Sequence, residues 1–277
     1  MIDFPSVAFI GGGNMANALV SGLLSQQCPS NKIHVVEVAE PLRALWSERG
    51  ISTGAAPDER LQNHKVWIFA VKPQQMKEVV SQCKPWMSAD TLVISIAAGI
   101  SIASLSSWLG SPDAPFQNIV RCMPNTPALV GAGVTGLAAP EVLSTENRHS
   151  ATNLLSAVGQ VVWVKDDAAI DAVTALSGSG PAYVFLFLEA LINGGESLGL
   201  STNQAKQLAL ATLAGATKLA SDSTDTPATL RERVTSKGGT TAAALAVFQD
   251  SNFVEIVTRA MSAADRRAAE LSEEFGG

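Results

Sequence analysis

Two kinds of apolar pattern divide the chain at about residue 165. Up to that point, short runs rich in β-branched residues alternate with longer segments of helical composition. The predicted strands are residues 7–10, 33–38, 66–71, 92–96, 118–121, 134–137 and 161–164, and the predicted helices are residues 15–24, 42–49, 75–80, 102–108 and 146–157. This alternation is typical of βαβ units on a mostly parallel, doubly wound sheet.

The pattern changes after Asp166 and Asp167. No later run alternates like a strand, and helices are predicted at residues 168–176, 182–192, 203–220 and 253–271. We therefore predict an α/β domain over residues 1–165 followed by an all-α domain over residues 166–277. Leu208, Leu210 and Leu213 make their helix apolar on more than one face, which fits either burial against a second subunit or an ordinary bundle core within one chain.

Composition and charge exclude several classes of protein. Apolar residues make up 47% and charged residues 16%, so a substantial core is expected. A net charge of −6 provides no positive field for nucleic acid or an anionic membrane. Three cysteines without CxxC spacing argue against disulfides and a structural zinc site, so we expect no metal and a reducing, cytoplasmic location. The most apolar windows, residues 91–100 and 182–192, are about half the ~20 residues of a membrane span, which favours a soluble protein.

The first chemical motif follows the first predicted strand. Gly11, Gly13 and Ala16 fit the G-x-G-x-x-G/A dinucleotide fingerprint between a strand and a helix, the context in which the pattern has weight. The first glycine permits a tight turn, the second lets the backbone approach a pyrophosphate, and the alanine allows close packing of helix on strand. The motif predicts a Rossmann-type domain with the phosphates at the helix N-terminus.

Glu37 ends the second predicted strand, where an acidic residue accepts hydrogen bonds from the ribose hydroxyls of NAD. Its carboxylate would repel the 2′-phosphate of NADPH unless a cation such as Arg43 offsets it. The position therefore favours NADH. A solvated glutamate at a strand end fits the same pattern.

Two further strand ends should border the cofactor, because ligands of doubly wound sheets lie beyond the carboxyl ends of the strands. One carries Ala70, Val71, Lys72 and Pro73, and the other covers residues 95–99. Lys72 is either a phosphate or ribose contact or an ordinary exposed lysine. Asn125 follows another strand in a proline-rich segment and is a candidate contact to nicotinamide or substrate, although this segment alone is also typical of a turn.

A second glycine turn lies in the predicted helical domain, just before a helix that begins near Ala242. Glycines there allow close approach, and amides at the helix start face an anion. The turn and the helix start carry Ser236, Gly238, Gly239, Thr240 and Thr241. The segment predicts a cradle for a carboxylate. A helix N-cap would need only one of these hydroxyls.

The helical domain has no histidine, since His34, His64 and His149 all precede it. A carbonyl-reducing dehydrogenase needs a strong acid or base at the oxygen. An imine is basic enough to be protonated in solution and mainly needs alignment against a dihydronicotinamide. The residue types therefore favour an imine substrate.

Six motifs in order give nearly the whole chain a resemblance to the pyrroline-5-carboxylate reductase family. They are FIGGGNMA, AVKPQ, SIAAGI, RCMPNTPALVGAGVTGL, ALSGSGPAYVF and SKGGTT. The resemblance implies an N-terminal Rossmann-type doubly wound sheet, an all-α dimerisation domain that intertwines with a second subunit, and a homodimer or higher homo-oligomer. It also implies reduction of 1-pyrroline-5-carboxylate to L-proline by NADPH or NADH, the last step of proline biosynthesis.

Matched residue by residue, the resemblance implies the site residues. The dinucleotide would be lined by Gly11, Gly13, Asn14, Met15 and Ala16, with Ala70, Val71, Lys72 and Pro73 on its ribose and nicotinamide side. The substrate carboxylate would be held by Ser236, Gly238, Gly239, Thr240 and Thr241, with Thr241 as the catalytic residue near the ring nitrogen. The chain departs from the family at Lys237, where many members carry proline, and at Glu37, where NADPH-preferring members often begin an Asn-Arg or Ser-Arg pair.

Two alternative functions are compatible with parts of the pattern. A β-hydroxyacid dehydrogenase resembles the chain around Gly178 and Gly180, but it carries a catalytic lysine where this chain has Val184. A redox sensor that binds a dinucleotide and a partner protein would not need the second glycine turn.

Overall fold

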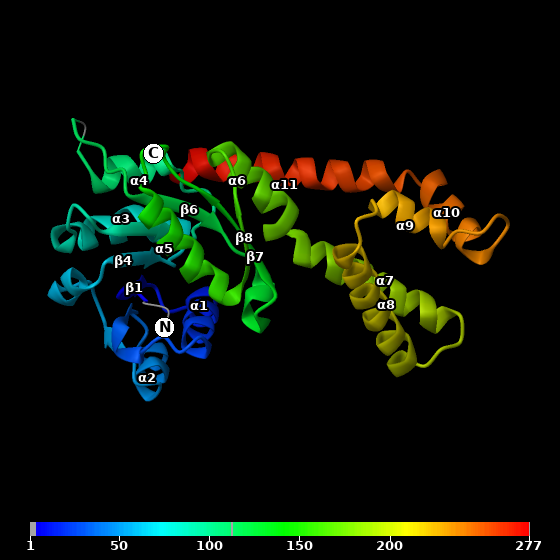
Figure 1. Cartoon of the computed structure of the whole chain (residues 1–277), viewed down its shortest axis with the longest axis horizontal. Coiled ribbons are helices and arrows are strands. Elements are labelled where there is room, and N and C mark those ends of the chain that lie inside the picture. The colour runs from blue at the N-terminus through cyan, green and yellow to red at the C-terminus, as the bar shows by residue number, and fades with distance from the viewer. Residues whose placement is uncertain (1–3, 112, 277) are drawn as a thin grey trace. The chain divides into compact units, whose positions relative to one another are not determined.

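The structure, a computed structural model, describes residues 4–111 and 113–276 (Figure 1). It has two compact units. The sheet unit contains the chain up to Ser179 and again from Ala264 onward, and the helical unit is Gly180–Ala263.

The sheet unit is built on an eight-stranded sheet of order β3-β2-β1-β4-β5-β6-β7-β8. The strands are β1 (Val7–Ile10), β2 (Ile33–Val36), β3 (Ser52–Gly54), β4 (Val66–Phe69), β5 (Leu92–Ser95), β6 (Ile119–Met123), β7 (Gly133–Ala138) and β8 (Gly159–Trp163). Neighbouring strands pair in parallel except β6 and β7, which are antiparallel. The order reverses at β1, which lies between β2 and β4, so the predicted α/β doubly wound class is confirmed.

Helices cover both faces of this sheet (Figure 1). They are α1 (Asn14–Ser25), α2 (Glu40–Glu48), α3 (Pro73–Cys83), α4 (Ile102–Leu109), α5 (Thr145–Leu155), α6 (Asp167–Val173) and the end of α11 (Phe253–Phe275). Short 3₁₀ turns lie at Ser30–Lys32, Glu59–Asn63, Lys84–Trp86, Thr126–Val130 and Ser156–Val158, and a π-helical turn, Thr174–Gly178, follows α6.

The two faces of β1 show how the sequence directs the packing. Val7 and Phe9 join a buried cluster with residues of α1 and α5, whereas Ala8 and Ile10 join a second cluster with residues of α3 and α4. Side chains alternate across a strand, so a strand buried on both faces is apolar throughout. This is why the continuous apolar runs predicted the central strands correctly.

The division between the units differs from the predicted boundary at residue 165. Ile170 of α6 is buried against Met123 and Ala138 of the sheet, and the last turns of α11 bring Leu271 against Gly99. The compact helical unit therefore begins at Gly180 and ends at Ala263. Helical composition predicted these helices but carries no information about the surface on which each one packs.

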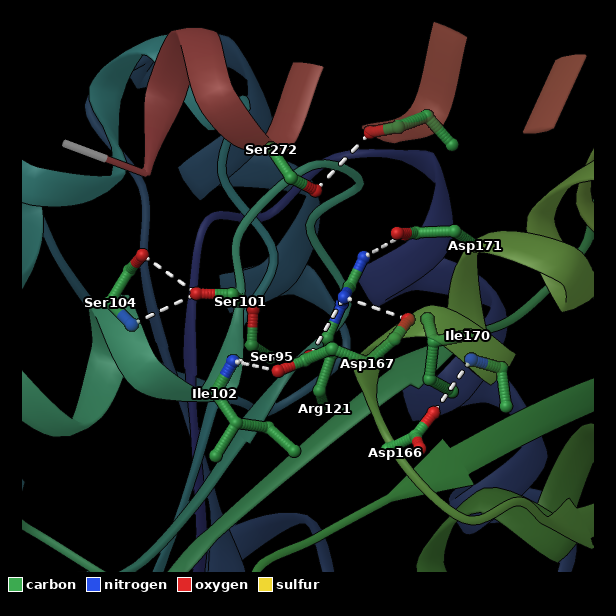
Figure 2. Close-up of polar contacts among 12 residues, drawn as sticks. Ser95, Ser101, Ile102, Ser104, Arg121, Asp166, Asp167, Ile170, Asp171 and Ser272 are labelled. Atoms are coloured by element: carbon green, nitrogen blue, oxygen red, sulfur yellow. Dashed lines mark hydrogen bonds and ion pairs between the residues drawn. The ribbon is translucent and has the colours of Figure 1, made fainter. Parts of the chain in front are cut away.

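A buried ion cluster anchors α6 to the sheet (Figure 2). Arg121 on β6 is 1% exposed, and its Nη1 and Nη2 lie 2.8 Å from Asp167 Oδ1 and 2.7 Å from Asp171 Oδ1. The Asp167 carboxylate also accepts the N–H of Ile102, the first residue of α4, at 3.1 Å and 3.2 Å. A carboxylate at a helix N-terminus is stabilised by the helix dipole, so one cluster joins β6, α6 and α4.

Replacing Arg121 by methionine should therefore lower the free energy of unfolding by about 3–5 kcal/mol, because two partly buried carboxylates lose their cation. Chemical denaturation measures the change. Arg267→Met is the matched control, because its ion pairs with Glu270 and Glu274 are exposed and should contribute under about 1 kcal/mol. Equal losses in the two variants would contradict the assignment.

His34 on β2 is fully buried, with its Nδ1 2.9 Å from Ser52 Oγ. Burial, and secondarily the positive charge of Arg60, lowers its pKa to about 4 from 6.5. Because protonation is then easier in the unfolded chain, the contribution of His34 to stability is complete above pH 6.5 and declines as the pH falls toward 4.

We expect about 2 kcal/mol of the stability lost between pH 7 and pH 5 to disappear in His34→Gln, as measured by urea unfolding at both values. The exposed His149 gives the control, since His149→Gln should leave that pH dependence unchanged. The same pH dependence in wild type and His34→Gln would refute the prediction.

The helical unit contains α7 (Gly180–Ser197), α8 (Thr202–Asp222), α9 (Pro227–Arg233), α10 (Thr240–Asp250) and the first turns of α11. A capping box formed by Ser201 and Gln204 begins α8, which packs against α7. Of the described residues in this unit, only Ala205 and Ala209 are buried apolar residues. Large apolar side chains on α7, α8, α10 and α11 remain exposed in the single chain.

Two short elements were not predicted. The strand β3 has only three residues, Ser52, Thr53 and Gly54, and none of them is apolar. It is recognisable only from its pairing with β2. The helix α9 begins at Pro227, between the predicted helix at residues 203–220 and the second glycine turn.

Candidate functional site

The first glycine turn connects β1 to α1 and has the backbone that its sequence demands. Gly11 has φ +100°, a conformation that L side chains rarely adopt, and an added Cβ would lie 2.6 Å from the Ala70 carbonyl oxygen. A Cβ at Gly13 would meet nothing within 4 Å in the described structure. The backbone at Gly13 is therefore open to a ligand, as the fingerprint requires.

Gly13 is also the N-cap residue of α1, and no side chain in the described structure caps this helix end. The amides of Asn14, Met15 and Ala16 form the first turn, which carries the positive end of the helix dipole. Ala16 is 1% exposed and packs in the core, so its side chain serves helix packing rather than ligand contact. The helix start is suited to bind a phosphate.

Glu37 and Trp46 hold the peptide groups of the central glycine. Glu37 Oε2 accepts the N–H of Gly12 at 2.8 Å, and Oε1 accepts the N–H of Ala39 at 2.8 Å. The Trp46 indole N–H donates to the Gly12 carbonyl oxygen at 3.3 Å. Glu37 is therefore a structural clamp of the turn, a role that the sequence did not reveal.

A cavity of about 310 Å³ lies at this carboxyl edge of β1, β2 and β4. It brings together six of the predicted cofactor residues, which are Gly11, Gly13, Glu37, Ala70, Val71 and Lys72. Its wall also contains Ala55, Ala56 and Pro57 from the segment after β3. Pro73 is the first residue of α3, next to this wall, where proline is favoured because the amide needs no partner. The size and lining of the cavity fit part of a dinucleotide.

Asn125 does not share this cavity. Its Nδ2 donates to the Ser177 carbonyl oxygen at 3.1 Å, and its Oδ1 accepts the Val134 N–H at 3.0 Å. Both ends of the amide thus connect the segment after β6 to β7 and to the π-helical turn. The side chain is buried and positions this segment through both contacts. Its contact to nicotinamide or substrate stays a prediction.

The second glycine turn lies in the helical unit, at the start of α10. Gly238 has φ +73°, and a Cβ at Gly239 would lie 2.5 Å from Ser236 Oγ. Gly239 is the N-cap residue, without a side-chain cap in the described structure, and Thr240 and Thr241 form the first helical turn. Amides and hydroxyls therefore gather at one helix start, which is the arrangement expected of a carboxylate site.

The described residues contain no group of three or more His, Cys, Asp or Glu side chains that could hold a metal ion. Burial raises the pKa of Cys83 to about 12, so this thiol is inert near neutral pH. The two glycine turns therefore present backbone amides and hydroxyl groups to a ligand.

These features define a Rossmann-type dinucleotide-binding oxidoreductase with a separate helical unit. Two family models match the chain accordingly. Residues 6–99 match NADP oxidoreductase coenzyme F420-dependent, and residues 167–271 match pyrroline-5-carboxylate reductase dimerisation.

Named relatives agree along the whole chain. The pyrroline-5-carboxylate reductase of Pseudomonas aeruginosa is 45% identical over 98% of this chain and 98% of its own. A solved pyrroline-5-carboxylate reductase from Coxiella burnetii is 39% identical with a TM-score of 0.89, covering 98% of this chain and 99% of that one. The Plasmodium falciparum pyrroline carboxylate reductase, solved with NADP bound, is 27% identical with a TM-score of 0.86, covering 98% and 100%. The chain belongs to the pyrroline-5-carboxylate reductase family.

Proposed function

We propose that the protein reduces 1-pyrroline-5-carboxylate to L-proline with NADPH or NADH, the last step of proline biosynthesis. The observation that carries the proposal is full-length similarity to pyrroline-5-carboxylate reductases, with both glycine turns present. A bound nicotinamide coenzyme supplies the hydride. The protein binds and aligns the two reactants, and an imine that is already protonated needs mainly this alignment.

The proposed cofactor residues form two groups, one at the pyrophosphate and one on the ribose and nicotinamide side. Gly11 and Gly13 admit the pyrophosphate to the backbone, and the amides of Asn14 and Met15 face it. Ala70, Val71 and Lys72 line the cavity beside the glycine turn, and Pro73 begins the helix that follows them. We assign them to the ribose and nicotinamide side.

The substrate residues belong to the turn before α10. Gly238 and Gly239 allow the carboxylate to reach the helix amides, and Ser236 and Thr240 add hydroxyl donors. Thr241 is the proposed catalytic residue. It follows Thr240 in the first turn of α10, and its hydroxyl would orient the ring nitrogen of the substrate.

We also propose that the enzyme is a soluble, cytoplasmic homodimer or higher homo-oligomer. The segment Asp167–Ser197 has the length and composition of a membrane span. Only 6% of its most apolar window is buried within the single chain, so its apolar surface needs another cover. The dimerisation family model covers this segment, so a second subunit accounts for the exposed apolar surface.

Steady-state oxidation of NADH and NADPH tests the proposal. We expect oxidation only when 1-pyrroline-5-carboxylate is added, with proline appearing in equal amount. Oxidation of NADH or NADPH by the carbonyl forms of 3-hydroxy acids, or reduction of NAD+ or NADP+ by the 3-hydroxy acids themselves, would instead favour a β-hydroxyacid dehydrogenase. Coenzyme binding without any turnover would favour a redox sensor.

A further inference from the structure

We infer that Glu37 makes NADH the preferred coenzyme of this protein over NADPH. The inference rests on the proposed function and deepens it by assigning the coenzyme. It comes from the carboxylate geometry in the cavity and from the partners of the nearby cations.

The carboxylate is fixed inside the coenzyme cavity. Its two oxygens accept the N–H groups of Gly12 and Ala39, each at 2.8 Å, and the residue lines the cavity. Charge-assisted bonds to two backbone amides hold it against rotation away from a ligand. Each oxygen retains acceptor capacity, because a carboxylate offers about four lone-pair sites.

The arginines near Glu37 bind groups other than its carboxylate. Arg43 donates through Nη1 to the carbonyl oxygens of Glu37 at 2.8 Å and of Val38 at 2.6 Å, so its guanidinium binds backbone. Arg60 forms a bidentate ion pair with Asp58 through Nε and Nη2, and its Nη1 donates to the Thr53 carbonyl oxygen. Within the described ranges, Glu37 itself forms no ion pair.

Lys72 is the one cationic residue lining the cavity in the described structure, and it lies on the other side of the glycine turn. Glu37 follows β2 and Lys72 follows β4, and these strands flank β1. At about 4.8 Å per strand, the two backbones are about 10 Å apart. Lys72 is therefore suited to the pyrophosphate or nicotinamide side and not to the ribose beside Glu37.

These positions favour a hydroxyl over a phosphate at the ribose 2′ position. A hydroxyl donates to the fixed carboxylate, whereas a 2′-phosphate carries about −1.5 to −2 charges at neutral pH and only accepts. The neighbouring lining residues after β3, Ala55, Ala56 and Pro57, have apolar side chains and offer no side-chain donor to a phosphate. Among the described residues that line the cavity, none on the Glu37 side is cationic, so none of them offsets the repulsion.

The test compares the dissociation constants of NADH and NADPH by calorimetry, together with kcat/KM for both coenzymes. We expect wild type to bind NADH about 10-fold or more tightly than NADPH, and Glu37→Gln to narrow this ratio by about 3–10-fold. Loss of the Gly12 clamp would weaken both coenzymes, because both share the pyrophosphate site. The ratio therefore isolates the effect of the charge.

Two further variants complete the design. Glu37→Asp keeps the charge and should keep the NADH preference even where both affinities fall. Glu40→Gln removes the same charge three residues away, from an exposed position at the start of α2, and should leave the ratio unchanged.

A wild-type preference for NADPH, or an equal ratio in wild type and Glu37→Gln, would overturn the inference and leave Glu37 as a clamp only. Binding is measured without substrate. A protein that prefers NADH but does not reduce 1-pyrroline-5-carboxylate would therefore refute the proposed function and not the coenzyme assignment.

Discussion

Replacing Thr241 by alanine should lower kcat and kcat/KM together by about 10–100-fold while leaving the dissociation constant of NADH within about 2-fold. The hydroxyl belongs to the first turn of α10 beside the glycine turn, where we place the substrate carboxylate and ring nitrogen. One hydrogen bond made mainly in the transition state accounts for about 1.5–3 kcal/mol. Steady-state kinetics with varied substrate and calorimetry with NADH measure the two effects.

Conservative variants separate chemistry from helix capping. Thr241→Ser keeps the hydroxyl and should retain most of the turnover, whereas Thr241→Val keeps the shape and should resemble Thr241→Ala. Thr202→Ala is the matched control, because Thr202 is an exposed threonine in the first turn of α8 in the same unit. Unchanged turnover in Thr241→Val would show that the Thr241 hydroxyl has no catalytic role and that the residue only forms part of the helix start.

Sequence reasoning located the first glycine turn because strand, glycines and helix each leave a local signature. Gly11 needs its positive φ and its close approach to Ala70, and both requirements are visible as glycine in the sequence. The clamp on Gly12 is different. Trp46 of α2 binds the Gly12 carbonyl oxygen although it lies 34 residues further along the chain. Neither its residue type nor its spacing from Gly12 predicts that contact.

Asn125 is a residue whose role the sequence alone leaves open. Two nearby prolines and a strand end predict a ligand contact, and the structure adds that its amide binds Ser177 and Val134. A side-chain amide serves a ligand or the backbone with equal chemistry, so only the partners decide its role. The compact helical unit begins later than the predicted domain, at Gly180, because helical composition does not distinguish α6 on the sheet from helices of the other unit. The dimerisation family model begins at residue 167, close to the predicted boundary.

An assembly of at least two chains should persist at micromolar concentration, and an active monomer should not be found. The helical unit buries too little apolar surface by itself, since Phe185, Leu208, Leu210, Phe248 and Val254 are all more than a third exposed. So many large exposed apolar side chains in one helical unit are unusual on a monomer. The match to a dimerisation family model over residues 167–271 agrees with this expectation.

Charge substitution on that surface gives the sharper test, because an aspartate is harmless on an exposed face and costly in an interface. Val254 on α11 is 76% exposed and Val142 in the sheet unit is 72% exposed, so the two valines are matched in the single chain. In a two-fold symmetric interface each substitution occurs twice, at about 2 kcal/mol each. Val254→Asp should therefore raise the dimer dissociation constant by about 10³-fold, whereas Val142→Asp should not change it. Analytical ultracentrifugation measures both, and equal behaviour of the two variants would show that the face of α11 at Val254 is not part of the interface.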